Sequence, residues 1–216
     1  MAQQLPTLIS SSVDHLVYAT VDLDRGIREL ESLLGVRATD GGRHPGRGTR
    51  NALLALGDDT YLEVIAPDPD QPPPPSERWF AIDRLTTSRL VAWAAKTSDV
   101  DAVHDRALQQ GVPLGDVRAG SRRQPDGVEL SWRFTDPGHV VAGGVVPFFI
   151  DWGQSPHPAR SAAKGATLVE LRAEHPDARN VRRMFETLGI QISVRESLRP
   201  ALVAVIEGRH GRVEIR

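Results

Sequence analysis

The chain has 216 residues, of which 25% are charged, and its formal net charge is −2. This balance is typical of a water-soluble protein and leaves no basic surface that would hold nucleic acid or an anionic membrane by charge alone. Cysteine is absent, which excludes disulfides, thiolate metal sites and a cysteine nucleophile. A metal ion would need imidazole and carboxylate ligands, which suit zinc, manganese, iron or nickel.

The first twelve residues, MAQQLPTLISSS, are predicted to be a tail. They contain neither a cationic start nor a long apolar run, so they do not resemble a signal peptide. No window of the sequence has the roughly 20 apolar residues that a membrane helix needs. We therefore expect a cytoplasmic protein whose partner is a small molecule, with no role for nucleic acid or a membrane.

A first unit is predicted over residues 13–72. It begins with a strand, VDHLVYAT, whose alternation places His15, Val17 and Ala19 on one face. Asp22 is suited to cap the helix that follows, and Gly35 is suited to end it. The apolar stripe of that helix consists of Leu23, Ile27, Leu30 and Leu34.

The second half of this unit is predicted to be a loop followed by a hairpin. The segment RATDGGRHPGRG is rich in glycine and arginine, so we expect a loop with at most one short edge strand. NALLAL and TYLEVIAP then form the hairpin, with Tyr61, Glu63 and Ile65 facing one way. The following DPDQPPPP is an extended connector that cannot enter a sheet interior.

The pattern restarts twice, over residues 86–152 and, in a shorter β-α-β-β form, over 160–216. The three helices are expected to end at Gly35, Gly111 and Gly189, which are 76 and 78 residues apart. Such regular spacing indicates an internal repeat of β-α-β-β-β modules. Because a lone helix cannot bury its apolar stripe, we predict an α+β fold in which the helices pack against curved, mostly antiparallel sheets.

The phrases VDHLVYATVDLDRGIRELESLLGV, GGRHPGRGTRNALLALGDDTYLEVIAPDPDQP, PFFIDWG and HPAR resemble the glyoxalase-like domain proteins of the vicinal oxygen chelate superfamily. The resemblance extends over residues 13–216. It implies paired modules that form a cup, with metal ligands on the first and last strands of each module. It also implies small-molecule chemistry of the lyase, isomerase or dioxygenase type, and a homodimer is possible.

Carried over to this sequence, the resemblance implies a divalent metal (Zn, Mn, Fe or Ni) bound by His15 and Glu63, with Glu63 also catalytic. The second module departs from that pattern, because alignment of the helix-ending glycines places Val91 opposite His15 and a phenylalanine opposite Glu63. In the third module Glu214 lies near the place of Glu63. Pairing of modules one and three would therefore complete a His15, Glu63 and Glu214 site, whereas pairing of modules one and two would not.

Four further residues are predicted to bind substrate. Arg50 suits a carboxylate or another anion, since guanidinium binds such groups in a bidentate manner, and Asn51 suits substrate oxygens. Tyr61 shares the face of Glu63. His44 would reach the substrate from a loop that closes over the cup. The large aromatic residues are expected mainly in the core, with one or two walling the pocket; they are Trp93, Trp132, Phe148, Phe149 and Trp152.

Three functions remain open from the sequence. The first is a metal-dependent enzyme, in which the ion stabilises an oxyanion of the substrate. The second is a metal-free protein that binds or sequesters a small molecule in the same cup, as resistance proteins of the superfamily do. The third is an interaction role in which the third module forms a dimer surface. No nucleophile elbow, phosphate loop or dinucleotide fingerprint is present.

Overall fold

The structure is a computed structural model that describes residues 12–124 and 127–216. The predicted tail therefore lies outside the described residues except for Ser12. Within the described ranges, no helix is long and apolar enough to cross a membrane.

The first module contains one helix and four strands. They are β1 (Val13–Ala19), α1 (Leu23–Leu34), β2 (Thr39–His44), β3 (Thr49–Ala55) and β4 (Tyr61–Pro67). Asp22 caps α1 by accepting a hydrogen bond from the Arg25 amide at 2.7 Å. The segment predicted to be a loop with at most one short edge strand contains the six-residue edge strand β2, which pairs with β3. A short 3₁₀ segment, η1 (Trp79–Arg84), lies in the connector to the second module.

The second module repeats this order. Its elements are β5 (Arg89–Lys96), α2 (Val100–Gln109), β6 (Val117–Arg123), β7 (Glu129–Thr135), the 3₁₀ turn η2 (Ala142–Gly144) and β8 (Phe148–Asp151). Strand β6 was not predicted, because its sequence VRAGSRR is polar and shows no apolar alternation. It lies at the end of the sheet order, and within the described residues it pairs only with β7.

The third module follows the short 3₁₀ turn η3 (Pro158–Arg160). It comprises β9 (Thr167–His175), α3 (Ala178–Leu188), β10 (Ser193–Glu196), β11 (Ala201–Gly208) and β12 (Gly211–Ile215). The unpredicted β10 has only four residues, so its sequence carries little periodic signal. Gly35, Gly111 and Gly189 follow the three helices with φ of 71°, 72° and 71°, the left-handed conformation that favours glycine at a helix end.

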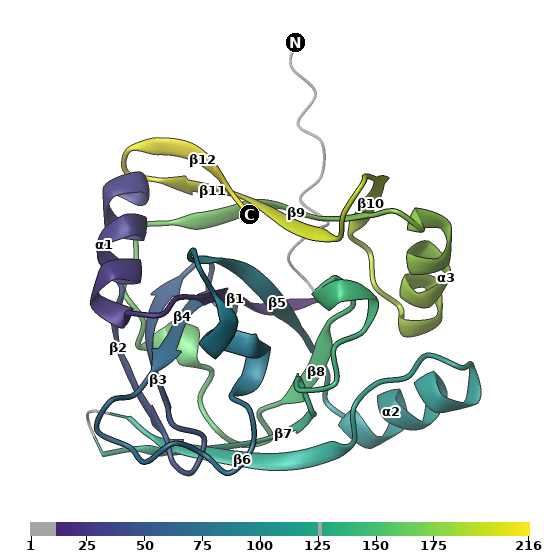
Figure 1. The fold of residues 1–216 in the computed structure, drawn as a ribbon, viewed down its shortest axis with the longest axis horizontal. Helices are drawn as coiled ribbons and strands as arrows, with labels where there is room; N and C mark the ends of the chain where they lie inside the picture. The colour runs from purple at the N-terminus through teal and green to yellow at the C-terminus, as the bar shows by residue number, and fades with distance from the viewer. Residues whose placement is uncertain (1–11, 125–126) are drawn as a thin grey trace.

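Modules one and two together form one eight-stranded sheet, in the order β2-β3-β4-β1-β5-β8-β7-β6. The sheet curves around so that its two end strands, β2 and β6, approach each other (Figure 1). Module three forms a separate four-stranded sheet, β10-β9-β11-β12. The predicted α+β class with curved sheets that form a cup is confirmed, and modules one and two build the cup.

The main hydrophobic core lies outside the cup. It joins one face of the eight-stranded sheet to the helices and to the four-stranded sheet, and includes Leu16, Leu30, Trp93, Phe185 and Ile206. The four-stranded sheet spans the top of the view, with α1 and α3 at its two ends (Figure 1). A hydrogen bond from the Leu90 amide to the Arg216 carbonyl links the two sheets. The cup interior is therefore free to hold polar groups.

Candidate functional site

The cup encloses a cavity in which charged and aromatic side chains meet. The empty space is about 460 Å³, part of it open to solvent, which is the size of a small-molecule site. Its lining comes from both modules of the large sheet and from η1. The residues are His15, His44, Asn51, Tyr61, Glu63, Ile65, Trp79, Phe80, Arg122, Trp132, Phe134, Pro137, Phe148, Ile150 and Trp152.

A β-bulge in β1 places Asp14 beside His15. Val13 pairs with Ala95 and His15 pairs with Ala94, so Asp14 is an extra residue in the ladder. Such a bulge turns a side chain that would otherwise point to the opposite face. As a result, the Asp14 Oδ1 and His15 Nδ1 atoms are 2.7 Å apart although the residues are adjacent. Asp14 therefore orients the imidazole and leaves its Nε2 atom facing the cavity.

Asp14 is a buried carboxylate that two other groups also contact. Its Oδ2 atom accepts a hydrogen bond from Trp152 Nε1 at 3.0 Å and lies 3.2 Å from His157 Nε2. Burial opposes ionisation, but the hydrogen bonds from His15 and His157 outweigh it and lower the Asp14 pKa to about 2. Neither Asp14 nor His157 was predicted as a site residue. His157 contributes from the linker between modules two and three, where its sequence context indicates only a turn.

Glu63 lies between two imidazoles. Its Oε2 atom is 3.9 Å from His15 Nε2, and its Oε1 atom is 3.8 Å from His44 Nε2. Asn51 Nδ2 donates a 2.5 Å hydrogen bond to Oε1. His44 is not on a mobile-loop lid: it ends strand β2 and is buried, with Nδ1 2.9 Å from Thr49 Oγ1. Burial lowers the His44 pKa to about 4, although the Glu63 charge opposes this effect.

Tyr61 stacks on His15, with ring centroids 4.6 Å apart and an interplanar angle of 18°. Burial, with the charges of Asp14 and Glu63, raises the Tyr61 pKa well above its usual value. The phenol therefore stays neutral and restricts the imidazole plane. Tyr61, Glu63 and Ile65 all line the cavity, which is the face that strand alternation predicted for them.

The second module contributes an aromatic wall. Trp132, Phe134, Phe148 and Trp152 line the cavity, whereas Trp93 and Phe149 pack in the main core. Neighbouring rings of the wall are in contact, with the Trp132 and Trp152 centroids 5.2 Å apart. Three of the five aromatic residues expected mainly in the core therefore face the cavity instead.

One arginine reaches the cavity, and it is not the predicted one. Arg50 lies on β3 beside Asn51, and adjacent residues of a strand point to opposite faces. Asn51 points into the cup, while Arg50 lines a separate groove with Leu23 and Asp40. Arg122 on β6 takes the position in the cavity and is 3% exposed. No motif marks Arg122 in the sequence, because β6 itself gave no strand signal.

Glu214 is not brought to this site. It lies on β12 in the four-stranded sheet, where its carboxylate bonds to Arg172 at 2.7 Å and to Arg216 at 3.0 Å. The expected His15, Glu63 and Glu214 centre therefore does not form, because module three does not pair with module one.

Module two shows which of its residues correspond to His15 and Glu63. In its strand register Ala94 pairs with Phe148, just as His15 pairs with Tyr61 in module one.

That register makes Ala94 and Ile150 the counterparts of His15 and Glu63, in place of the expected Val91 and phenylalanine. Neither counterpart can ligate a metal. Among residues 12–124 and 127–216, no group of three histidine, aspartate or glutamate side chains is arranged to hold an ion. His15 and Glu63 are the residues that would hold an ion here, as one imidazole and one carboxylate donor. Because a second pair of ligands is missing and Arg122 adds positive charge, the donor set does not fit a resident divalent metal.

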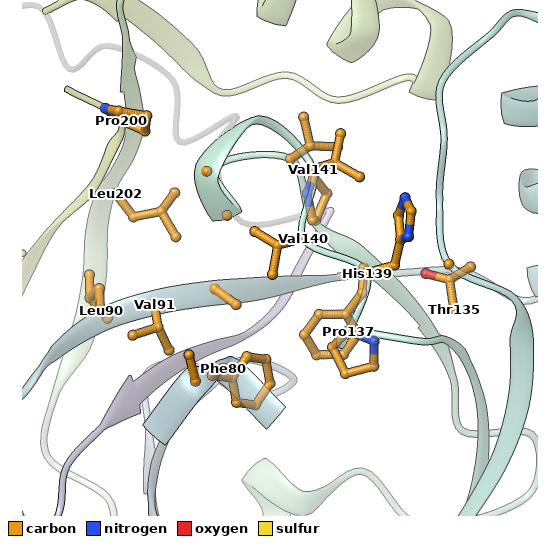
Figure 2. Close-up of a pocket in the computed structure, with 18 of the residues that line it drawn as sticks. Phe80, Leu90, Val91, Thr135, Pro137, His139, Val140, Val141, Pro200 and Leu202 are labelled. Atoms are coloured by element: carbon orange, nitrogen blue, oxygen red, sulfur yellow. The ribbon is translucent and has the colours of Figure 1, made fainter. Parts of the chain in front are cut away.

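A second, larger cavity adjoins the first. It has about 930 Å³ of empty space, part of it open to solvent. Figure 2 shows that Val91, Val140, Val141 and Leu202 surround it, with His139 at one side. The two cavities share Phe80, Pro137 and Phe148 in their linings. Its lining mixes apolar side chains with polar ones, among them Arg89, Asp136 and His139.

The cup of paired β-α-β-β-β modules with an interior polar site defines a protein of the vicinal oxygen chelate superfamily. The profile of the glyoxalase-like domain family matches residues 13–189, and the chain belongs to that family. The fold is shared with a hypothetical protein from Staphylococcus aureus, at a TM-score of 0.66 and 12% identity over 87% of both chains.

Two epimerase structures are also similar to this chain. Methylmalonyl-CoA epimerase from Mycobacterium tuberculosis is 26% identical, with a TM-score of 0.44, over 68% of this chain and 92% of the epimerase. Methylmalonyl-CoA epimerase from Streptomyces coelicolor is 21% identical, with a TM-score of 0.47, over 67% and 96%. No protein of curated function matches the sequence.

Proposed function

We propose that the protein is a small-molecule enzyme that transfers a proton at a carbon next to a carbonyl group, as isomerases, epimerases and many lyases do. The observation that carries this proposal is the pair of His15 Nε2 and Glu63 Oε2, 3.9 Å apart and buried in one cavity. An acid and a base at this separation can act on neighbouring atoms of one substrate.

The two residues have distinct roles in this reaction. Glu63 takes the proton from the substrate carbon, and the electrons of that C–H bond form the C=C bond of an enol. His15, protonated at Nε2, donates its proton to the carbonyl oxygen as the C=O electrons move there. Asp14 holds the Nδ1 proton of His15 throughout, and Asn51 fixes the other oxygen of Glu63. Proton return to another carbon or face completes an isomerisation.

The test is exchange with solvent deuterium. The full-length protein is incubated in D₂O with ketones, 2-oxo acids and thioesters, and loss of the α-proton signal is followed by NMR. Glu63→Gln and His15→Gln should each slow exchange by about 10²- to 10⁴-fold, the usual contribution of a general acid or base. His104→Gln on α2 is the control and should exchange at the wild-type rate.

Two results would contradict the proposal. One is exchange that persists at the wild-type rate in both site variants. The other is exchange that is lost in EDTA and restored by a divalent ion, which would assign the chemistry to a metal.

The aromatic wall favours a second candidate function, a protein that binds and sequesters a small molecule without altering it. Rings such as Trp132 and Trp152 bind planar ligands by stacking. This candidate predicts ligand-dependent thermal stabilisation without exchange or turnover, and with no loss of stabilisation in Glu63→Gln.

A further inference from the structure

Arg122 is a buried cation for which the described residues supply no carboxylate partner. Its side chain lines the cavity of His15 and Glu63 from β6, on the opposite module. The Nη1 atom is buried and makes no hydrogen bond. Throughout residues 12–124 and 127–216, no aspartate or glutamate forms an ion pair with this guanidinium. Glu63 lines the same cavity and forms no ion pair with this guanidinium within the described residues.

An unpaired buried charge is costly, so natural proteins rarely keep one without a role. The other arginine that is buried among the described residues has carboxylate partners. Arg172 is 6% exposed and lies near three carboxylates, those of Glu170, Glu174 and Glu214, the last at 2.7 Å. The contrast indicates that the missing partner of Arg122 is supplied from outside the chain.

The surroundings of Arg122 restrict what that partner is. A guanidinium binds a carboxylate in a planar, bidentate manner. The adjacent wall is aromatic: Trp132 pairs with Gly120, two residues along β6 from Arg122, and its ring neighbours those of Phe134 and Trp152. A ligand that places its carboxylate on Arg122 therefore places the rest of its body against these rings, with its far end toward Glu63.

We propose that Arg122 is the anion-binding residue of this site and that the substrate is a small carboxylate with an aromatic or otherwise apolar body. The claim that this carboxylate is the substrate rests on the proposed function. The claim that it binds at Arg122 does not. Enolisation of such a compound at a carbon next to a carbonyl group at its far end then occurs between Glu63 and His15.

Binding is tested by calorimetry with two matched pairs of probes, benzoate with benzamide and phenylacetate with phenylacetamide. The wild-type chain should bind each carboxylate at least tenfold more tightly than its neutral amide. Arg122→Met should lose at least tenfold in carboxylate affinity. Arg122→Lys should lose less, because lysine keeps the positive charge but cannot bind a carboxylate in a bidentate manner. Arg123→Met, the exposed neighbour on the same strand, should bind as the wild type does.

The melting temperature of the ligand-free protein distinguishes a role of Arg122 in anion binding from a role in stabilising the fold. If Arg122 serves only to bind an anion, Arg122→Met should melt at or above the wild-type temperature, because an unpaired buried charge has been removed. A lower melting temperature together with unchanged benzoate affinity would overturn the proposal. Equal wild-type affinity for carboxylates and amides, or no saturable binding of either carboxylate, would overturn it as well.

His15→Gln makes the two proposals separable. This variant should keep wild-type affinity for phenylacetate while losing deuterium exchange. Carboxylate binding that depends on Arg122, in a chain that never exchanges a proton, would refute the proposed function alone. Exchange that depends on Glu63 but not on Arg122, with unchanged binding in Arg122→Met, would refute the anion site alone.

Discussion

The two modules of the eight-stranded sheet share one topology but differ in chemistry. Module one places titratable groups inside the cup, among them His15, His44 and Glu63. Module two places apolar residues at the matching positions, with Ala94 and Ile150 as counterparts of His15 and Glu63. Its single charge in the cavity is Arg122. One half of the cup therefore supplies most of its titratable groups, and the other supplies a mostly apolar wall.

The largest effect expected from this asymmetry is on stability at low pH. The His44 pKa is lowered to about 4, below its usual 6.5. Between these values the unfolded chain binds a proton that the folded chain does not, so stability falls as pH drops from 6.5 to 4, by about 3 kcal/mol. His44→Gln should remove this step in urea unfolding followed at several pH values. His139→Gln, an exposed histidine of module two, should retain it; a step that survives in His44→Gln would contradict the assignment.

Asp14 should add a second step at lower pH. Its folded pKa of about 2 lies below the usual 3.8, so its stabilising contribution is complete above 3.8 and is lost as pH falls toward 2. The expected loss is about 2 kcal/mol. The same urea series should show it in the wild type and not in Asp14→Asn.

Neighbouring residues on β3 test which face of module one carries the site. Asn51 donates to Glu63 inside the cup, while Arg50 lies on the outer face. Asn51→Ala should reduce deuterium exchange about 10- to 100-fold, because a hydrogen bond to a charged group is lost. Arg50→Met should leave exchange within twofold of the wild type. Equal losses in both variants would show that strand orientation does not decide their roles.

The smallest effect concerns a hydrogen bond that module two supplies to the buried Asp14 of module one. Trp152 donates to Asp14 Oδ2 from just beyond β8. Trp152→Phe should cost about 1.5 kcal/mol in unfolding free energy. Trp132→Phe is the matched control, since its indole makes no hydrogen bond within the described part of the chain, and it should cost less. In a double-mutant cycle, the Trp152→Phe cost should vanish in the Asp14→Asn background.

Much of the fold and part of the site follow from local sequence patterns. Alternation alone assigned Tyr61, Glu63 and Ile65 to one face, and helix periodicity with terminal glycines gave the three-module repeat. These features depend on the conformation of a few consecutive residues, so they are encoded where they occur. For the same reason, the polar end strand β6 and the four-residue β10 were not predicted.

Only the tertiary structure decided which groups meet. The Asp14 side chain turns toward His15 because of a bulge against β5, and His157 reaches the same carboxylate from a linker 143 residues away. The sequence left open whether Glu214 joins His15 and Glu63, because no single module encodes which modules pair; in the structure Glu214 lies in the four-stranded sheet. Arg122 becomes significant only because the sheet curves and carries β6 into the cup opposite Glu63. Sequence determined the elements and their faces, whereas non-local strand pairing determined the site.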